Sequence, residues 1–208
     1  MNAADAFVAA LRQGGVTTLF GLPGSTEAAL LSAVGSQGGG PERGGPERGG
    51  PEGGGPGGSE GGLRYVLGLH EGIVVSMADG YARVSGGPAV VGLHTSVGTM
   101  NGLSQTFNAY RDHSPVVVTA GHKDRAVLDE DGFCAFADLA SLPRSFAKWS
   151  WQSLSAGAVA GDLRRALHLA MAPPRGPVYL AVPEDLMREE LPAGPQAPAG
   201  EWADPVRA

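Results

Sequence analysis

Short, continuous apolar runs alternate with helical patterns along most of this 208-residue chain. A strand that is apolar at nearly every position is typical of a parallel sheet with helices on both faces. The alternation therefore predicts an α/β fold, a doubly wound six-stranded parallel sheet. The predicted strands are Thr17–Leu22, Leu63–Leu69, Pro88–His94, Pro115–Ala120, Phe146–Trp151 and Pro177–Val182. The predicted helices are Ala3–Gln13, Thr26–Val34, Glu71–Val84, Gly98–Arg111 and Ala156–Met171, with a less regular stretch around 135–142.

One segment, residues 35–62, breaks this alternation. It consists almost entirely of Gly, Pro, Glu and Arg, and GGPER occurs at 39–43 and again at 44–48. Such a repeat has no apolar residues to bury, so we expect a disordered surface insertion within a single domain spanning 1–188. A Pro/Ala/Gly-rich tail follows at 189–208.

The composition excludes several classes of protein. Charged residues make up 17% of the chain and the formal net charge is −6, so nothing indicates binding to nucleic acid. No basic cluster suggests attachment to a membrane surface, and the apolar runs are too short to span one. The amino terminus lacks the basic start of a signal peptide, and the single cysteine has no internal disulfide partner. We therefore expect a cytoplasmic protein.

Glu71 stands at the junction of a predicted strand and a predicted helix. It shares the i, i+3, i+4, i+7 spacing of Val74, Val75, Ala78 and Ala82, so it belongs to the apolar helix face. A buried carboxyl group has a raised pKa and becomes a tool for proton transfer near neutral pH. The alternative is a solvent-facing Glu that interacts with the helix dipole. The spacing alone leaves both interpretations open.

Two further strand ends carry polar residues. The turn after the first strand contains Ser25, which together with Thr26 is suited to capping the next helix. His94 ends the third strand. If these strands are neighbours, Ser25, Glu71 and His94 converge on one rim, where acid–base chemistry is one interpretation and structural hydrogen bonding is the other. No spacing of His, Cys, Asp and Glu indicates a zinc site.

Taken together, these motifs resemble the pyrimidine-binding (Pyr) domain of thiamine-diphosphate-dependent enzymes. The resemblance is to the amino-terminal domain of the benzoylformate decarboxylase and acetolactate synthase-like group. It covers nearly the whole chain outside the insertion and the last twenty residues. The matching segments are TTLFGLPGSTE (17–27), LRYVLGLHEGIVVSMADGYARVSGGPAVVGLHTSVGTMNGL (63–103), HSPVVVTAG (113–121), LPRSFAKWS (142–150) and RGPVYLAVPED (175–185).

The resemblance implies a role for each residue at the rim. In this family the Glu that corresponds to Glu71 hydrogen-bonds N1′ of the cofactor's aminopyrimidine, and proton exchange there activates the thiazolium carbon that attacks a 2-oxo acid. Ser25 would hold the substrate carboxylate, and His94 would shuttle protons at the carbonyl oxygen. Further cofactor contacts would come from Pro23, Gly24, Gly98 and Asn101.

The sequence departs from the family in one major respect. Family members usually continue into a diphosphate-binding (PP) domain, where a GDG motif and a downstream Asn hold magnesium, but this sequence contains no GDG. We therefore expect Mg²⁺ and the diphosphate to be held by a separate PP subunit in an α2β2-type assembly. Met1 and the full set of six strands favour a natural small subunit.

The sequence thus predicts one subunit of a split thiamine-diphosphate enzyme that decarboxylates a 2-oxo acid, with or without carboligation to an acyloin. A non-catalytic Pyr-domain paralogue or scaffold, which binds a related enzyme without turnover, is the alternative. A piece of a longer enzyme is a third hypothesis. Retention of Glu71, Ser25 and His94 argues against a scaffold, which needs none of them.

Overall fold

A computed structural model describes residues 1–36, 62–130 and 132–192. The predicted insertion at 35–62 and the predicted tail therefore lie largely outside the described residues. Within them, six parallel strands form one sheet in the order β2-β1-β3-β4-β6-β5. The strands are β1 (Thr18–Gly21), β2 (Arg64–Leu67), β3 (Ala89–His94), β4 (Val116–His122), β5 (Ser150–Gln152) and β6 (Val178–Pro183). The predicted fold class is confirmed.

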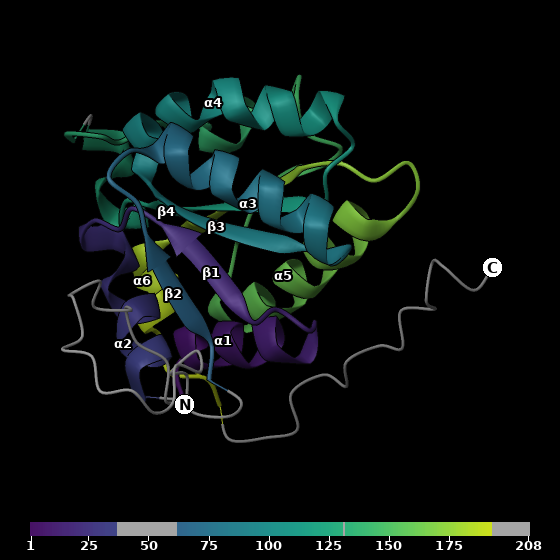
Figure 1. The fold of residues 1–208 in the computed structure, drawn as a ribbon. Helices are drawn as coiled ribbons and strands as arrows, with labels where there is room; N and C mark the ends of the chain where they lie inside the picture. Colours follow the sequence, from purple (N-terminus) through teal and green to yellow (C-terminus); the bar gives the residue numbers. More distant parts are fainter. Residues whose placement is uncertain (37–61, 131, 193–208) are drawn as a thin grey trace, which may run out of the picture.

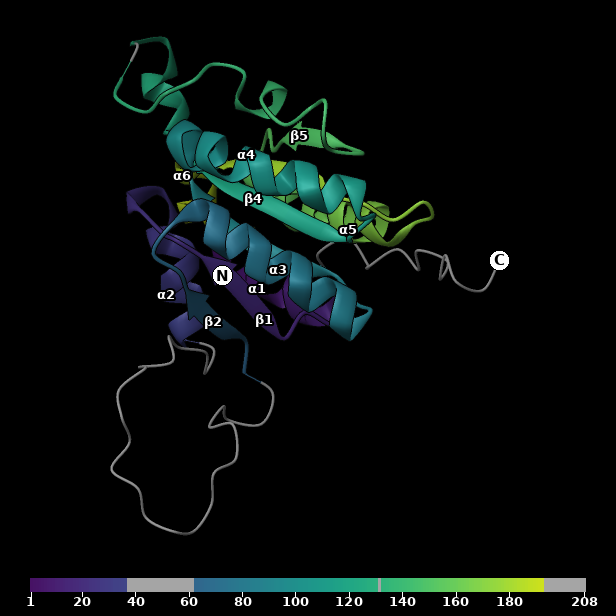
Figure 2. The ribbon, with the colours of Figure 1, turned by 45° about the horizontal axis from the view of Figure 1, so that its top comes forward.

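Helices cover both faces of the sheet (Figures 1 and 2). One face packs against α1 (Ala3–Gln13), α2 (Ala28–Ser36), α5 (Ala156–Met171) and α6 (Glu184–Arg188), and the other against α3 (Glu71–Ser85) and α4 (Thr95–Arg111). Consecutive strand residues face opposite cores: Val90 and Val117 face the α1–α5 side, and Val91 and Val118 face the α3–α4 side. This division explains why the strands are apolar at nearly every position.

Most predicted bounds lie within two residues of those in the structure, and two elements differ by more. The fifth strand, predicted at Phe146–Trp151, is confined to Ser150–Gln152 at the sheet edge. Phe146 is apolar for another reason, because its ring packs edge-on against Phe107 of α4 with centroids 5.3 Å apart. The fourth helix begins at Thr95 rather than at Gly98, and Thr95 adopts φ 52°, which is uncommon for a β-branched residue.

The end of the domain contacts its beginning. Glu190 forms an antiparallel bridge with Asn2, and the Leu191 amide donates to the Met1 carbonyl at 3.0 Å. The first residues of the predicted tail therefore belong to the folded domain. Within the described part of the chain, no helix is both long enough and apolar enough to cross a membrane.

The strand order reverses between β1 and β3, since the chain moves outward from β1 to β2 and then returns to β3. All strands are parallel, so their carboxyl ends meet at one rim, with Gly21 beside both Leu67 and Gly92, and His94 beside Gly121. A ligand site in a doubly wound sheet lies outside the strand ends at such a reversal. The fold thus places the predicted site residues at a position suited to ligands.

Candidate active site at the carboxyl ends of β1, β2 and β3

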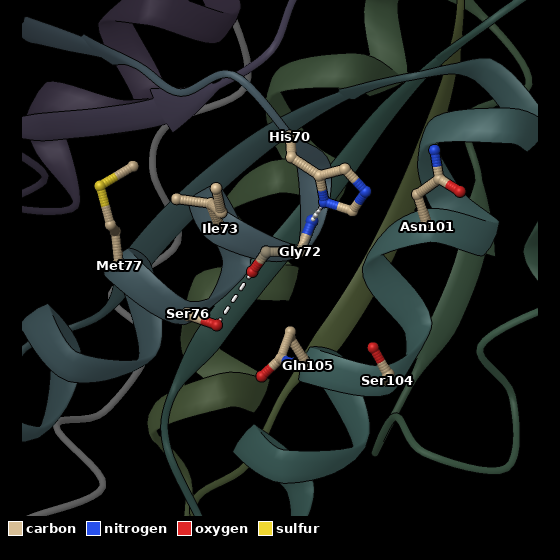
Figure 3. A pocket seen from close by; sticks show the side chains of 8 residues that line it. All are labelled: His70, Gly72, Ile73, Ser76, Met77, Asn101, Ser104 and Gln105. Atoms are coloured by element: carbon tan, nitrogen blue, oxygen red, sulfur yellow. Dashed lines mark hydrogen bonds between the residues drawn. The ribbon is translucent and has the colours of Figure 1, made fainter.

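Glu71 is the first residue of α3, directly after the N-cap residue His70. His70 Nδ1 accepts a hydrogen bond from the Gly72 amide at 3.0 Å, which fixes the start of the helix (Figure 3). The Glu71 side chain is half-buried, whereas Val74, Val75, Ala78 and Ala82 of the predicted face are buried. The structure therefore confirms the apolar face and places Glu71 at its partly open end.

The Glu71 carboxylate points toward the first turns of α4. Its Oε2 accepts a hydrogen bond from Asn101 Nδ2 at 3.1 Å. A methyl group added at Gly98 would lie 3.4 Å from Glu71 Oε1, so a glycine here leaves space beside the carboxylate. Gly98 and Asn101 thus both lie next to Glu71, and the cofactor contacts that the resemblance implies for them stay predictions.

An open groove of about 470 Å³ lies between α3 and α4 beside this carboxylate (Figure 3). Asn101 lines the groove and also contacts Glu71, so it connects the two features. The remaining groove residues come from the N-cap and first two turns of α3 and from α4: His70, Gly72, Ile73, Ser76, Met77, Ser104 and Gln105. The groove mixes polar and apolar side chains and adjoins the Asn101–Glu71 pair through Asn101.

His94 lies at the end of β3, one helical turn before Gly98. Its side chain is 28% exposed, and its Nδ1 lies 3.1 Å from Glu27 Oε2 and 2.9 Å from Thr26 Oγ1. Ser25 is exposed and is the first residue of the short 3-10 helix Ser25–Glu27, which follows the turn after β1. Ser25 thus lies between Gly24 and Thr26, which both adjoin His94, while Gly98, four residues after His94, adjoins Glu71.

The turn before Ser25 is packed closely against the histidine. A Cβ atom added at Gly24 would overlap the His94 ring. The Gly24 amide donates to Glu27 Oε2 at 2.7 Å, so it is already used within the protein. Pro23 precedes it in the same turn and is half-buried. The cofactor contacts expected of Pro23 and Gly24 remain predictions.

Glu27 is a site residue that the sequence analysis missed. Its carboxylate is only 5% exposed and lies beneath His94. Glu27 also accepts a hydrogen bond from the amide of Gly24, the N-cap residue three positions earlier, which is the half of a capping box that a glycine N-cap allows. A Glu at the third position of a helix start is a recognisable sequence signal, and it could have identified Glu27 as an ordered residue.

The electrostatic effects of this cluster reach two buried tyrosines. Burial raises the pKa of Tyr65 above its ordinary value, and the charge of Glu27 raises it further. Burial likewise raises the pKa of Tyr179, whose hydroxyl lies 2.7 Å from Thr99 Oγ1. Both phenols therefore stay neutral, and the Tyr179 hydroxyl forms a buried hydrogen bond with Thr99. Among the described residues, no group of three or more His, Cys, Asp or Glu is arranged to hold a metal ion.

Comparison with known proteins matches residues 57–142 to the family described as "Thiamine pyrophosphate enzyme, N-terminal TPP binding domain". Benzoylformate decarboxylase from Pseudomonas aeruginosa is 40% identical over 184 residues, which are 88% of this chain and 30% of that protein. The chain belongs to the Pyr domains of the thiamine-diphosphate-dependent enzymes.

Two more relatives fit this assignment. The structure of a Rhodococcus jostii thiamine diphosphate-dependent 4-hydroxybenzoylformate decarboxylase matches with a TM-score of 0.77 and 34% identity, covering 92% of this chain and 32% of that one. The acetolactate synthase large subunit of Haemophilus influenzae is 26% identical over 89% of this chain and 28% of that protein. The Pyr domain thus spans about a third of the length of the relatives that it matches.

Proposed function

We propose that this chain is the Pyr subunit of a split thiamine-diphosphate-dependent enzyme that acts on a 2-oxo acid. Decarboxylation is the expected reaction, with or without carboligation to an acyloin. The proposal is supported by the family membership and by relatives named as decarboxylases and acetolactate synthases. We place this activity in the cytoplasm as part of the same proposal.

The observation that carries the proposal is the environment of Glu71. A carboxylate offers about four lone-pair positions, and Asn101 uses one of them. The half-buried side chain beside Gly98 is therefore able to accept a further hydrogen bond from a protonated ring nitrogen. The chemistry and space at Glu71 fit the aminopyrimidine of thiamine diphosphate.

Each rim residue has one task in this proposal. When bound, the cofactor supplies the electron sink that makes loss of carbon dioxide possible. Glu71 holds and exchanges a proton at the pyrimidine ring nitrogen, and Asn101 orients its carboxylate. His94 moves a proton at the substrate carbonyl oxygen, while Ser25 binds the substrate carboxylate from the exposed turn.

The partner in this proposal is a separate PP subunit that supplies the diphosphate and Mg²⁺ sites. Apolar side chains near Glu71 are exposed at the start of α3 and α4, including Ile73 at 52%, Val97 at 45% and Met100 at 49%. We expect the PP subunit to cover this surface in an α2β2-type assembly.

Reconstitution tests the proposal. The chain is co-expressed with a candidate PP subunit that carries GDG and a downstream Asn, and decarboxylation of benzoylformate and pyruvate is measured with thiamine diphosphate and Mg²⁺. We expect turnover only when both chains are present. A stable complex without turnover on any 2-oxo acid would instead identify a non-catalytic scaffold.

A further inference from the structure

A buried polar cluster lies directly beneath His94. Its centre is the Glu27 carboxylate, which is 5% exposed and is surrounded by the ends of β1, β3 and β4. A carboxylate in such a position is stable only if hydrogen bonds replace the water that it has lost. The identity of its partners therefore determines what it can do.

All the partners of Glu27 are compatible with a carboxylate that only accepts. Oε2 accepts the Gly24 amide at 2.7 Å, and Oε1 accepts the Gly121 amide at 3.0 Å. Backbone amides can only donate, so both oxygens must be acceptors. A glutamine cannot satisfy this arrangement, because its NH₂ group would face one of the two amides.

Thr26 links the Glu27 carboxylate to the His94 ring. The Thr26 hydroxyl donates its single hydrogen to Glu27 Oε1 at 2.6 Å. Its oxygen therefore presents a lone pair to His94 Nδ1, which lies 2.9 Å away. The other neighbour of Nδ1 is Glu27 Oε2, at 3.1 Å. Both neighbours of Nδ1 are acceptors, so Nδ1 must carry the proton.

We propose that Glu27 is a positioning residue that holds His94 in its Nδ1–H tautomer and leaves Nε2 as the basic nitrogen at the rim. Two glycines make the close approach possible. A Cβ at Gly24 would overlap the His94 ring, and a Cβ at Gly121 would overlap Glu27 Oε1.

The consequence for chemistry deepens the proposed function and rests on it. With Nε2 unprotonated, the ring can take up a proton at the substrate carbonyl oxygen and later return it. The ring is therefore neutral again after each cycle. While the ring is protonated, the Nδ1–H bond to Glu27 stabilises it, as a carboxylate does behind a catalytic histidine. The tautomer itself needs neither cofactor nor partner.

Nitrogen NMR of the 208-residue chain tests the tautomer directly. Long-range ¹H–¹⁵N spectra are recorded near pH 8, well above the ordinary imidazole pKa of about 6.5, and His94 is assigned from the spectrum of His94→Gln. We expect the Nδ1–H form to exceed the Nε2–H form by at least about tenfold, since hydrogen bonds to charged groups are worth that much. An even mixture, or an excess of Nε2–H, would overturn the proposal.

Three variants show which group sets the tautomer. Glu27→Gln should reduce the preference by about tenfold or more, whereas the control Glu71→Gln should leave it unchanged, because Glu71 does not contact the His94 ring. Thr26→Val removes the other acceptor beside Nδ1 but keeps Glu27, so the Nδ1–H form should persist. This variant tests the role of Glu27 if Glu27→Gln does not fold. An unchanged preference in Glu27→Gln, or a reversed one in Thr26→Val, would contradict the role of Glu27. A failed decarboxylation assay leaves this measurement unaffected.

Discussion

Two carboxylates at the same rim have different surroundings. Glu27 is 5% exposed and its oxygens are occupied by donors from the protein. Glu71 is half-buried and receives one side-chain donor, from Asn101. Glu27 is therefore suited to fixing a neighbouring side chain, and Glu71 is suited to binding a ligand.

The Asn101–Glu71 hydrogen bond gives a prediction at this scale. Asn101→Ala removes a donor that orients Glu71 but leaves the core intact, so we expect kcat of the reconstituted enzyme to fall about 2- to 10-fold, as the loss of one hydrogen bond of about 0.5–1.5 kcal/mol would produce. The free energy of unfolding should change by less than about 0.5 kcal/mol.

Asn108→Ala is the matched control for this substitution. Asn108 is also exposed on α4, where its Nδ2 donates to Gln105 Oε1 at 2.8 Å. Both variants are compared by steady-state kinetics and urea unfolding. Equal activity in Asn101→Ala and the wild type would show that Asn101 does not orient Glu71.

The sequence could identify Glu71 but not Glu27, for a physical reason. Glu71 follows the spacing of buried apolar residues on one helix, so a local pattern reveals it. The partners of Glu27 include His94 and Gly121, which are 67 and 94 residues away. Such long-range contacts leave no local pattern, and only the capping position of Glu27 was visible.

At the scale of the strands and helices, glycines mark where elements approach closely. A Cβ at Gly121, in β4, would overlap the side chains of Thr26 and Glu27. We expect Gly121→Ala to lower the free energy of unfolding by about 1–3 kcal/mol, as overpacking does. A loss below about 0.5 kcal/mol in urea unfolding would mean that the rim is not packed this way.

Gly161→Ala is the control within α5. Nothing lies within 4 Å of a Cβ added there, and the position is inside a helix. Alanine should therefore raise the free energy of unfolding by about 0.5–1 kcal/mol.

The end of β4 also predicts a pH dependence. His122 is fully buried, and its Nε2 lies 3.0 Å from the Phe136 carbonyl oxygen. This contact holds the loop that contains Phe136 against the end of β4. Burial lowers the pKa of His122 below its ordinary value, although the Phe136 carbonyl and Asp185 oppose the shift. The neutral form is favoured in the fold, so its stabilisation is present above pH ~6.5 and is lost as the pH falls below that value.

The measurement is urea unfolding at several pH values between about 5 and 7.5. The wild type should lose up to about 1.4 kcal/mol per pH unit through this group, and His122→Leu should lack that part of the slope. His113→Gln, which changes an exposed histidine, should keep it. If the free energy of unfolding depends on pH equally in His122→Leu and in the wild type, His122 is not the source of this pH dependence.

Elements with strong local patterns were predicted well, and those determined by tertiary contacts were not. The bounds of α1 and α5 agree with the prediction because their apolar periodicity is long. The five-residue helix α6 is too short to show a period. β5 is shorter than predicted because Phe146 packs on α4 instead of joining the sheet.

At the scale of the whole molecule, the insertion gives a prediction. Described residues end at the last residue of α2, Ser36, and resume at Gly62, just before β2. Deleting residues 38–60 shortens this connection, and loop closure costs only about 0.6 kcal/mol per doubling of length. We expect the free energy of unfolding to stay the same or rise by up to about 1.5 kcal/mol. A collapse in yield of folded protein would show that the repeat is structural.

The central claim is that Glu71 of this chain activates a cofactor that is completed by another subunit. The most direct measurement is the rate of hydrogen–deuterium exchange at the thiazolium C2 of thiamine diphosphate in the reconstituted complex. Glu71→Gln should slow this exchange at least about a hundredfold, the lower limit of typical acid–base contributions, while Glu190→Gln, at the amino-terminal contact, should not change it. An exchange rate in Glu71→Gln equal to that of the wild type would contradict the account.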